Sequence, residues 1–258
     1  MHTQFIIFMT IARREMNRIF RIWTQTLIPP VLNQSLYFVI FGGVVGANIA
    51  ISWGISYATF LMPGLVAMGV ITNSYSNVVS SLFGSKFSRS IEEFLISPTH
   101  PATLFLGHVV GWMVRGFIIA LITWVVSLFF GGYFVVHPTI VLITLFLLAY
   151  FFSALGFINA LFAKTFDQVS IVPTFFLTPL SYLGWIFYPI AMLPHWAQII
   201  SYFNPIAWVI TLLRYWFLGE THASMTSIWL ALFWLVVVSI ITTIITLRFL
   251  SRGQGIRT

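Results

Sequence analysis

The sequence predicts an all-α integral membrane protein with six transmembrane helices. Of its 258 residues, 59% are hydrophobic and only 7% are charged, whereas soluble domains carry about 25% charged residues. Six segments reach the roughly 20 apolar residues that a spanning helix needs, and the basic residues cluster in alternate loops between them. A soluble fold would not bury this much apolar surface, so a soluble enzyme is excluded.

The first predicted element is an amphipathic helix over residues 5–24. Apolar residues recur there at helical spacing beside a stripe of arginines: Met9, Ala12, Met16, Phe20 and Trp23 against Arg14, Arg18 and Arg21. A helix of this kind lies in the plane of the membrane interface. We expect Pro29 and Pro30 to separate it from the first span, because proline fits the first turn of a new helix.

The six spans are predicted from their apolar length. They cover residues 27–47, 58–82, 107–131, 138–162, 169–190 and 226–248. The fifth span contains Pro173 and Pro179, which predicts a kink.

The basic residues give the orientation. Ten of the twelve lie near the termini or in two of the loops: Arg13, Arg14, Arg18, Arg21, Lys86, Arg89, Lys164, Arg248, Arg252 and Arg257. With both termini in the cytoplasm all ten face inward, in agreement with the positive-inside rule. The loops over 48–57 and 132–137 hold no Lys or Arg, and only Arg214 falls on the outer side.

Residues 190–218 are too apolar for an ordinary loop, yet Pro194 and Pro205 interrupt them. We interpret them as short outer re-entrant helices, since irregular backbone at membrane depth must be buried in protein or border a wet cavity. The alternative is a seventh span broken at Pro205. That span would place Arg248 and Arg252 outside, against the charge pattern.

A charged island, Gly84–Pro98, separates the second and third spans. It holds Glu92 and Glu93, two of only five acidic residues in the chain. As a helix from Ser88 to Ser97 it gathers Ile91, Phe94 and Leu95 on one face and pairs Arg89 with Glu93. A short amphipathic helix suits a groove on another protein. A solvated loop held inside by its positive charge is the alternative.

The residues that carry catalysis or bind metals show no recognisable arrangement. There is no G-x-x-x-x-G-K-[ST] phosphate loop and no cysteine, and the six histidines lack metal-ligand spacing. The net charge of +7 is explained by inward-facing loops rather than by nucleic acid. We therefore expect no catalytic residue, no metal and no cofactor in this chain.

Across nearly its whole length the chain resembles the ABC-2 type permeases, the membrane subunits of ATP-binding-cassette exporters, and among them the YadH-like permeases of Gram-negative inner membranes. The resemblance rests on a series of short motifs in order: Arg18–Trp23, Thr26–Pro30, Leu36–Phe38 with Phe41-Gly42, Pro63–Leu65, Glu92–Leu95 with Pro98, Lys164–Phe166, and Asn204-Pro205 followed by Arg214.

The resemblance implies a single membrane domain over 1–258 in the bacterial inner membrane, working as a homodimer with two copies of an ABC ATPase that binds ATP and Mg²⁺. The island would be the coupling helix, with Lys86, Arg89, Ile91, Glu92, Glu93, Phe94 and Leu95 as contacts. The interfacial helix would add Arg13, Arg14, Glu15 and Arg18. The cargo would be amphipathic, lipid-linked or drug-like.

Polar side chains within the spans are candidates for the substrate path or for contacts between helices. They are Asn33, Tyr37, Asn73, Ser76, Asn77, Ser80, Thr174, Thr178 and Tyr182. Arg115 lies within the third span, where it either snorkels to the inner interface or contacts an anionic substrate.

Two other functional classes are alternatives. A secondary transporter or channel needs no ATPase, but such transporters usually show inverted repeats or acidic residues within spans, and this chain shows neither. A membrane enzyme or haem subunit lacks its site residues here.

Overall fold

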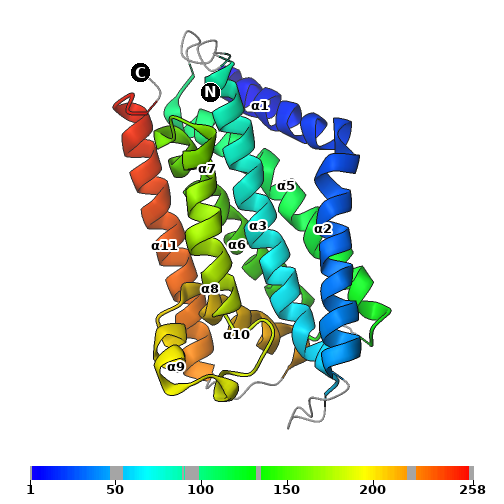
Figure 1. Ribbon diagram of the computed structural model, residues 1–258. Helices are drawn as coiled ribbons and strands as arrows, with labels where there is room; N and C mark the ends of the chain where they lie inside the picture. Colours follow the sequence, from blue (N-terminus) through cyan, green and yellow to red (C-terminus); the bar gives the residue numbers. More distant parts are fainter. Residues whose placement is uncertain are drawn as a thin grey trace.

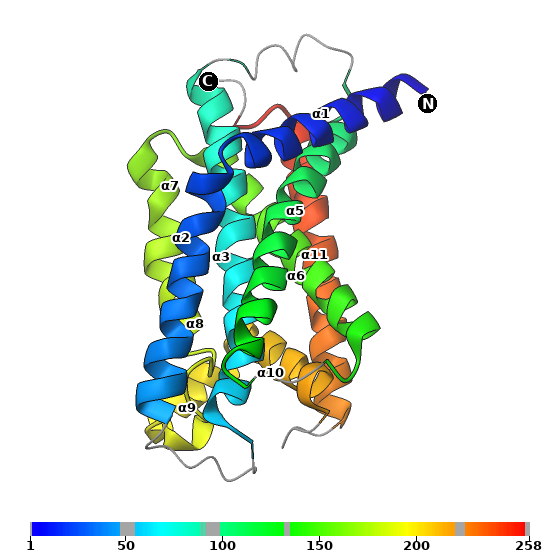
Figure 2. The same ribbon diagram turned by 90° about the vertical axis from the view of Figure 1, so that its right-hand side faces the viewer.

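The computed structural model describes residues 2–46, 55–88, 90, 99–131, 135–219 and 225–255, and every regular element within them is a helix (Figure 1). α1 (His2–Arg21) lies across one end of a bundle of long helices, as both views show (Figure 2). The long helices are α2 (Trp23–Tyr37), α3 (Tyr57–Phe87), α5 (Pro101–Leu128), α6 (Pro138–Phe162) and α11 (Met225–Ser251). The chain begins and ends at the α1 end.

Shorter elements complete the bundle. A π-helical segment, η1 (Phe38–Val45), continues α2. α7 (Phe166–Val172), the π-helical η3 (Pro173–Leu177) and α8 (Thr178–Tyr182) form a broken helix whose irregular part begins at a proline. A 3₁₀ turn, η4 (Ile190–Met192), follows. After it come α9 (His195–Tyr202) and α10 (Pro205–Leu218), whose axes meet at 82°.

Local chemistry sets the helix ends. The Ser56 hydroxyl accepts a hydrogen bond from the Thr59 amide at the start of α3. At the start of α10 the Asn204 side-chain oxygen accepts a hydrogen bond from the Ile206 amide, and Pro205 follows in the first turn. α10 stops at Gly219, whose φ of +77° places it in the left-handed region that favours glycine.

Four helical segments among the described residues are long and apolar enough to cross a membrane: Trp23–Val44, Pro101–Leu128, Pro138–Phe162 and Ile228–Ser251. The bent pair α9–α10 would be a fifth. The two other predicted spans do not meet this criterion. Polar residues over 72–81 dilute the apolar character of α3, and α7–α8 is broken into short pieces. The six-span count therefore stays a prediction.

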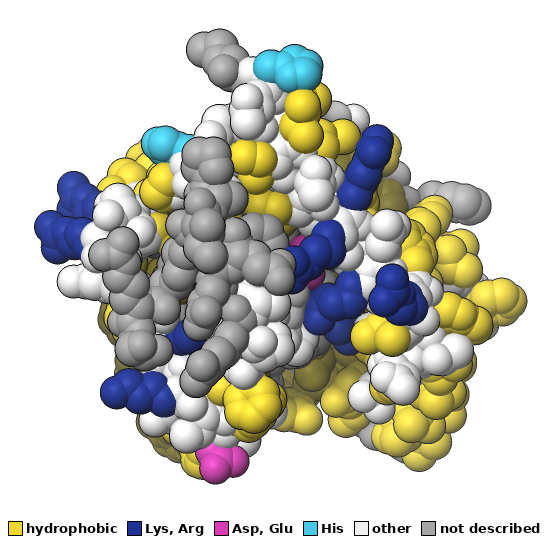
Figure 3. Space-filling model, turned by 90° about the horizontal axis from the view of Figure 1, so that it is seen from above, with side chains coloured by type: hydrophobic (Ala, Val, Ile, Leu, Met, Phe, Trp, Pro, Cys, Tyr) yellow, Lys and Arg dark blue, Asp and Glu magenta, His cyan; other side chains and the backbone are white. Residues whose placement is uncertain are grey.

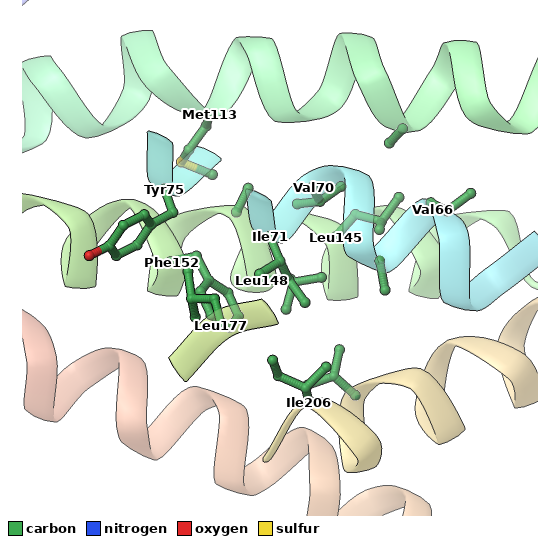
Figure 4. Packing of buried hydrophobic residues seen from close by; sticks show 14 of the residues in the cluster. Val66, Val70, Ile71, Tyr75, Met113, Leu145, Leu148, Phe152, Leu177 and Ile206 are labelled. Atoms are coloured by element: carbon green, nitrogen blue, oxygen red, sulfur yellow. The ribbon is translucent and has the colours of Figure 1, made fainter. Parts of the chain in front are cut away.

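α3 is the central helix of the core. Its apolar residues pack between α5 and α6, and Figure 4 shows Val66, Ile71 and Tyr75 among Met113, Leu148 and other buried side chains. Glycine permits close packing here: a Cβ on Gly156 of α6 would lie 2.9 Å from the carbonyl oxygen of Tyr75. Small residues at contacts let membrane helices approach closely.

One predicted boundary was wrong. Pro29 and Pro30 lie inside α2, and the chain breaks instead at Ile22, with φ −114° and ψ 35°. A single residue outside the helical region is enough to redirect a helix, so the prolines are not needed for this break.

The first residues of the island, Gly84–Phe87, form the last turn of α3, and Ser88 caps it. Arg89 and residues 91–98 lie outside the described ranges, so the predicted helix over 88–97 is untested.

Candidate functional site

α1 docks on the bundle through one narrow face. Ile11, Ala12, Glu15 and Ile19 are its buried residues. Two glycines of α5 allow the approach: a Cβ at Gly111 would lie 2.5 Å from the Glu15 Cβ, and one at Gly107 would lie 3.0 Å from the Ile11 Cβ. α1 thus rests directly on the α5 backbone, as small residues permit in membrane helix contacts.

The acidic side chain on this face sits in a polar cluster. The Glu15 carboxylate, in a residue only 1% exposed, accepts hydrogen bonds from the Ser81 hydroxyl and the Trp112 indole N–H, each at 2.7 Å. Arg18 forms an ion pair with it at 3.3 Å. Three helices therefore meet at one oxygen, Oε2, and a buried charge is tolerated because it is both paired and hydrogen-bonded.

Arg18 extends this cluster to α3. Its Nη2 donates to the Asn77 Oδ1 at 2.7 Å and to the Asn77 carbonyl oxygen at 3.2 Å. Burial lowers the pKa of Arg18, and the attraction of Glu15 opposes that shift. Glu15 is fully engaged inside the protein, and Arg18 largely so. A partner that docks on α1 would contact other residues first.

The sequence offered a signal for this cluster that the prediction did not use. Glu15 interrupts an apolar stripe of α1, Phe8, Ile11, Ala12 and Ile19, at helical spacing. An acid within such a stripe indicates a buried polar partner. Sequence reasoning grouped Glu15 with the arginines instead, and missed Ser81 and Trp112.

The other basic residues of α1, Arg13, Arg14 and Arg21, are exposed on its outer side. Figure 3 shows Lys and Arg side chains gathered on the face seen from the α1 end. Thr10, Arg13, Arg14, Asn17, Arg18 and Arg21 line a hollow of about 610 Å³ there. Arg14 also reaches the start of the island, where its Nη2 donates to the Ser85 hydroxyl at 3.4 Å. This hydrogen bond joins two segments that lie 71 residues apart in the sequence.

Lys86 has a structural role at the same end. Its Nζ donates to the carbonyl oxygens of Leu161 at 2.6 Å and of Ala160 and Ala163 at 3.2 Å. These oxygens lie at the C-terminus of α6, where a cation is favoured. Burial lowers the pKa of Lys86. Lys86 therefore fixes the last turn of α3 to the end of α6.

The other predicted coupling residues, Arg89, Ile91, Glu92, Glu93, Phe94 and Leu95, lie outside the described residues. Their contact with an ATPase stays a prediction.

The predicted path residues fall into two groups on α3. From Tyr57 to Phe83, the residues that are not buried form one stripe at i, i+4 spacing: Met68, Thr72, Ser76 and Ser80. Met68 and Thr72 are half-buried, whereas Ser76 and Ser80 are exposed. The stripe is thus polar and becomes more open toward the α1 end. Thr72 was not among the predicted residues.

Asn73 and Asn77, by contrast, are buried. The Asn73 amide donates to the Gly69 carbonyl oxygen at 2.9 Å within α3, and Asn77 binds Arg18. These two side chains stabilise the fold and do not line the open stripe.

The remaining path candidates lie on α2 and on η3–α8. Asn33, Thr174, Thr178 and Tyr182 are exposed, and Tyr37 is half-buried. At the end away from α1 the two elements meet through aromatic rings. Phe187 lies 4.7 Å from Phe41, 5.4 Å from Tyr37 and 5.6 Å from Tyr182, between ring centroids.

Arg115 lies one turn after Trp112 on α5 and is partly buried. Its Nε is buried and has no hydrogen-bond partner among the described residues. Both interpretations of Arg115, snorkelling and contact with an anionic substrate, stay open.

Arg214, expected in an outer loop, lies in α10 and is 4% exposed. Its Nη2 donates to the carbonyl oxygens of Trp185 and, at 3.3 Å, Ile186, and its guanidinium lies 3.8 Å from the centre of the Phe60 ring. Trp185 has φ +63°, a strained value for a bulky residue. Arg214 therefore stabilises the turn after α8.

The chain is similar to known proteins over its whole length. The sequence profile of the ABC-2 type transporter family matches residues 7–218. The inner membrane transport permease YadH of Escherichia coli K12 is 43% identical over 258 residues, which is 100% of this chain and 99% of that protein. Nodulation protein J of Rhizobium leguminosarum bv. viciae is 22% identical over 207 residues, covering 78% of this chain and 80% of that one. The chain belongs to the ABC-2 type transporter family.

Proposed function

We propose that this chain is the non-catalytic membrane subunit of an ATP-driven exporter in the bacterial inner membrane. It crosses the membrane six times as one domain, with both termini in the cytoplasm. Two copies assemble with two ABC ATPase subunits, which supply ATP and Mg²⁺. The name of its relative, an inner membrane transport permease, supports the location and the class of function.

One observation carries the proposal: α3 joins the two places that such a machine must couple. It is a single helix of 31 residues, about 46 Å long at 1.5 Å per residue. Its open hydroxyl stripe lies in the inner half, and its last turn leads directly into the island. Lys86 and Ser85 fix that turn to α6 and α1.

This geometry supports the following mechanism. ATP binding draws the two ATPase subunits together and displaces the islands docked on them. Because α3 is continuous, the displacement reaches the stripe of Thr72, Ser76 and Ser80, and the aromatic contact around Phe187 opens or closes the outer end. The partner shifts this equilibrium only by its difference in affinity for the two states.

A second copy gives the stripe its function. In one chain Ser76 and Ser80 are exposed. The Ser80 hydroxyl donates to the Asn77 carbonyl oxygen at 3.0 Å, and a hydroxyl without such a bond, facing lipid hydrocarbon, is unfavourable. A partner copy facing the stripe would enclose it as a polar path between two chains. The cargo is amphipathic, lipid-linked or drug-like, a class that the exposed rings of Phe175, Phe176 and Tyr182 on η3 and α8 would suit. A secondary transporter without an ATPase is the competing function.

The test is to co-express the tagged chain with its genomic neighbours, purify it with whatever binds it and measure ATP hydrolysis in lipid. We expect a stable complex whose ATPase activity in Phe94→Ala falls about tenfold, because apolar docking outweighs exposed ion pairs of about 0–1 kcal/mol each. Phe129→Ala, at the opposite end and 84% exposed, is the matched control. Lys86→Ala should affect coupling less than Phe94→Ala.

A chain that purifies without any ATPase would contradict the proposal and favour the secondary transporter. A complex in which Phe94→Ala and Phe129→Ala hydrolyse ATP equally would remove the coupling role of the island.

A further inference from the structure

A second hollow lies away from the α3 stripe, where α9 and α10 turn against α6 and α11. Its volume is about 420 Å³, within the range of roughly 300–1,000 Å³ of ligand pockets. The corner supplies Tyr202, Phe203 and Trp208, and α11 supplies Leu230, Trp234 and Val238. The hollow lies beside the corner where α9 and α10 meet at 82°.

The corner that shapes the hollow is rigid. Asn204, 1% exposed, accepts a hydrogen bond from the Ile206 amide at 2.9 Å and donates to the Leu180 carbonyl oxygen at 2.6 Å. Asn204 therefore holds both the start of α10 and the end of α8. The hollow is preformed, so a ligand does not pay for ordering it.

The lining offers no charge to a ligand. Among the described residues that line the hollow, none is ionised at neutral pH, and the Trp208 indole N–H is already donated to the Tyr202 carbonyl oxygen at 2.8 Å. A polar or charged ligand would lose its hydration here without replacement. A hydrocarbon chain needs only apolar contact.

The surroundings identify the source of such a chain. α6 and α11, which form two walls, are both apolar enough to cross a membrane, so the medium outside is lipid. Along α11 the lining runs from Leu230 to Val238, about 12 Å at 1.5 Å per residue. Tyr202 and Trp234 of the lining are 53% and 58% exposed, and amphipathic rings of this kind are enriched at the level of lipid headgroups.

We propose that this hollow is a binding site for one acyl chain of a bilayer phospholipid. The chain enters between Tyr202 and Trp234 and lies along α11 toward Val238. The headgroup stays outside, so the site selects for the hydrocarbon chain and not for the headgroup. The proposal is independent of the exporter function, and it is tested on the purified chain alone.

The test uses vesicles of phosphatidylethanolamine and phosphatidylglycerol that contain a phospholipid with a photoactivatable diazirine midway along one acyl chain. After irradiation, adducts are mapped by mass spectrometry. We expect adducts to concentrate on residues 202–209 and 230–238, equally with either headgroup on the probe. Val238→Phe, which narrows the inner end, should lower this yield about tenfold, since overpacking costs about one factor of ten or more in occupancy.

Ile240→Phe is the matched control, because Ile240 lies on the same helix, is 54% exposed and does not line the hollow. Leu230→Phe, at the exposed mouth, serves as a second blocking variant if Val238→Phe does not yield monodisperse protein. Equal adduct yields on 230–238 and on the Ile240 face would overturn the proposal. Yields that neither blocking variant changes, or an absence of adducts at the hollow, would do the same.

Discussion

Glu15 is the charged side chain on which the docking of α1 depends. Its carboxylate holds Ser81, Trp112 and Arg18. We expect Glu15→Ala to destabilise the protein by about 3 kcal/mol, because removal of one partner leaves the other charge partly buried and unpaired. Glu15→Gln keeps one acceptor oxygen and should cost about half as much. Thermal unfolding in detergent, followed by size-exclusion chromatography, measures both.

Arg13→Gln is the control for Glu15, because Arg13 lies on the exposed side of the same helix. If Glu15→Ala and Arg13→Gln unfold at the same temperature, the contacts of the Glu15 carboxylate do not stabilise the docking of α1.

At this scale the sequence predicted which residues share a helix face but not which face meets protein. In a membrane chain both the lipid-facing side and the buried side are apolar, so periodicity alone does not separate them. Glu15, Lys86 and Asn77 were predicted as partner or path residues, and each is engaged within the fold. Ser76 and Ser80, in contrast, are exposed, and their place on a substrate path stays a prediction.

Among the elements, the contact of α1 with α5 depends on glycine. A methyl group at Gly111 would lie 2.5 Å from the Glu15 Cβ and 3.3 Å from the Ala12 carbonyl oxygen, so α1 would have to move away. Alanine also favours a helix by about 1 kcal/mol over glycine. We expect the steric term to exceed this gain, and Gly111→Ala to lose about 1–3 kcal/mol of stability, as overpacking does.

Gly84→Ala is the matched control, and we expect it to raise the stability that Gly111→Ala lowers. Gly84 lies in α3, and a Cβ added there would meet no atom within 4 Å among the described residues, so alanine should stabilise there through helix propensity alone. Thermal unfolding that moves both variants in the same direction would show that close packing at Gly111 does not matter.

The elements themselves were predictable where a run of apolar residues is bounded by strong signals. The expected span 138–162 coincides with α6, whose first residue is Pro138. The irregular stretches η1 and η3 were not predictable, because π-helical backbone leaves no mark in hydropathy. Pro173 indicated a break near η3 but not its form.

On the scale of the whole molecule, the basic residues mark one end. α1, which holds Arg13 and Arg21, and the last turn of α11, which holds Arg248, lie at the same end of the bundle (Figure 1), and Figure 3 shows Lys and Arg side chains on the face seen from that end. The positive-inside rule predicts that this end faces the cytoplasm. The loop with Lys164, between α6 and α7, then lies inside, and α7–α8 must cross the membrane for His195 to lie outside.

The chain contains no cysteine, so single cysteines report their side without background. We expect Ser88→Cys, Lys164→Cys and Arg252→Cys, all at exposed positions, to react with a membrane-impermeant maleimide only after the cells are opened. His195→Cys and Val136→Cys, at exposed positions of the other end, should react in intact cells. Lys164 and His195 on opposite sides would establish that the broken helix α7–α8 is a span, although none of its pieces is long enough to cross a membrane alone. Lys164 and His195 on the same side would reduce the number of spans below six. The segment α7–α8 would then be re-entrant and would not form a wall of the substrate path across the whole membrane.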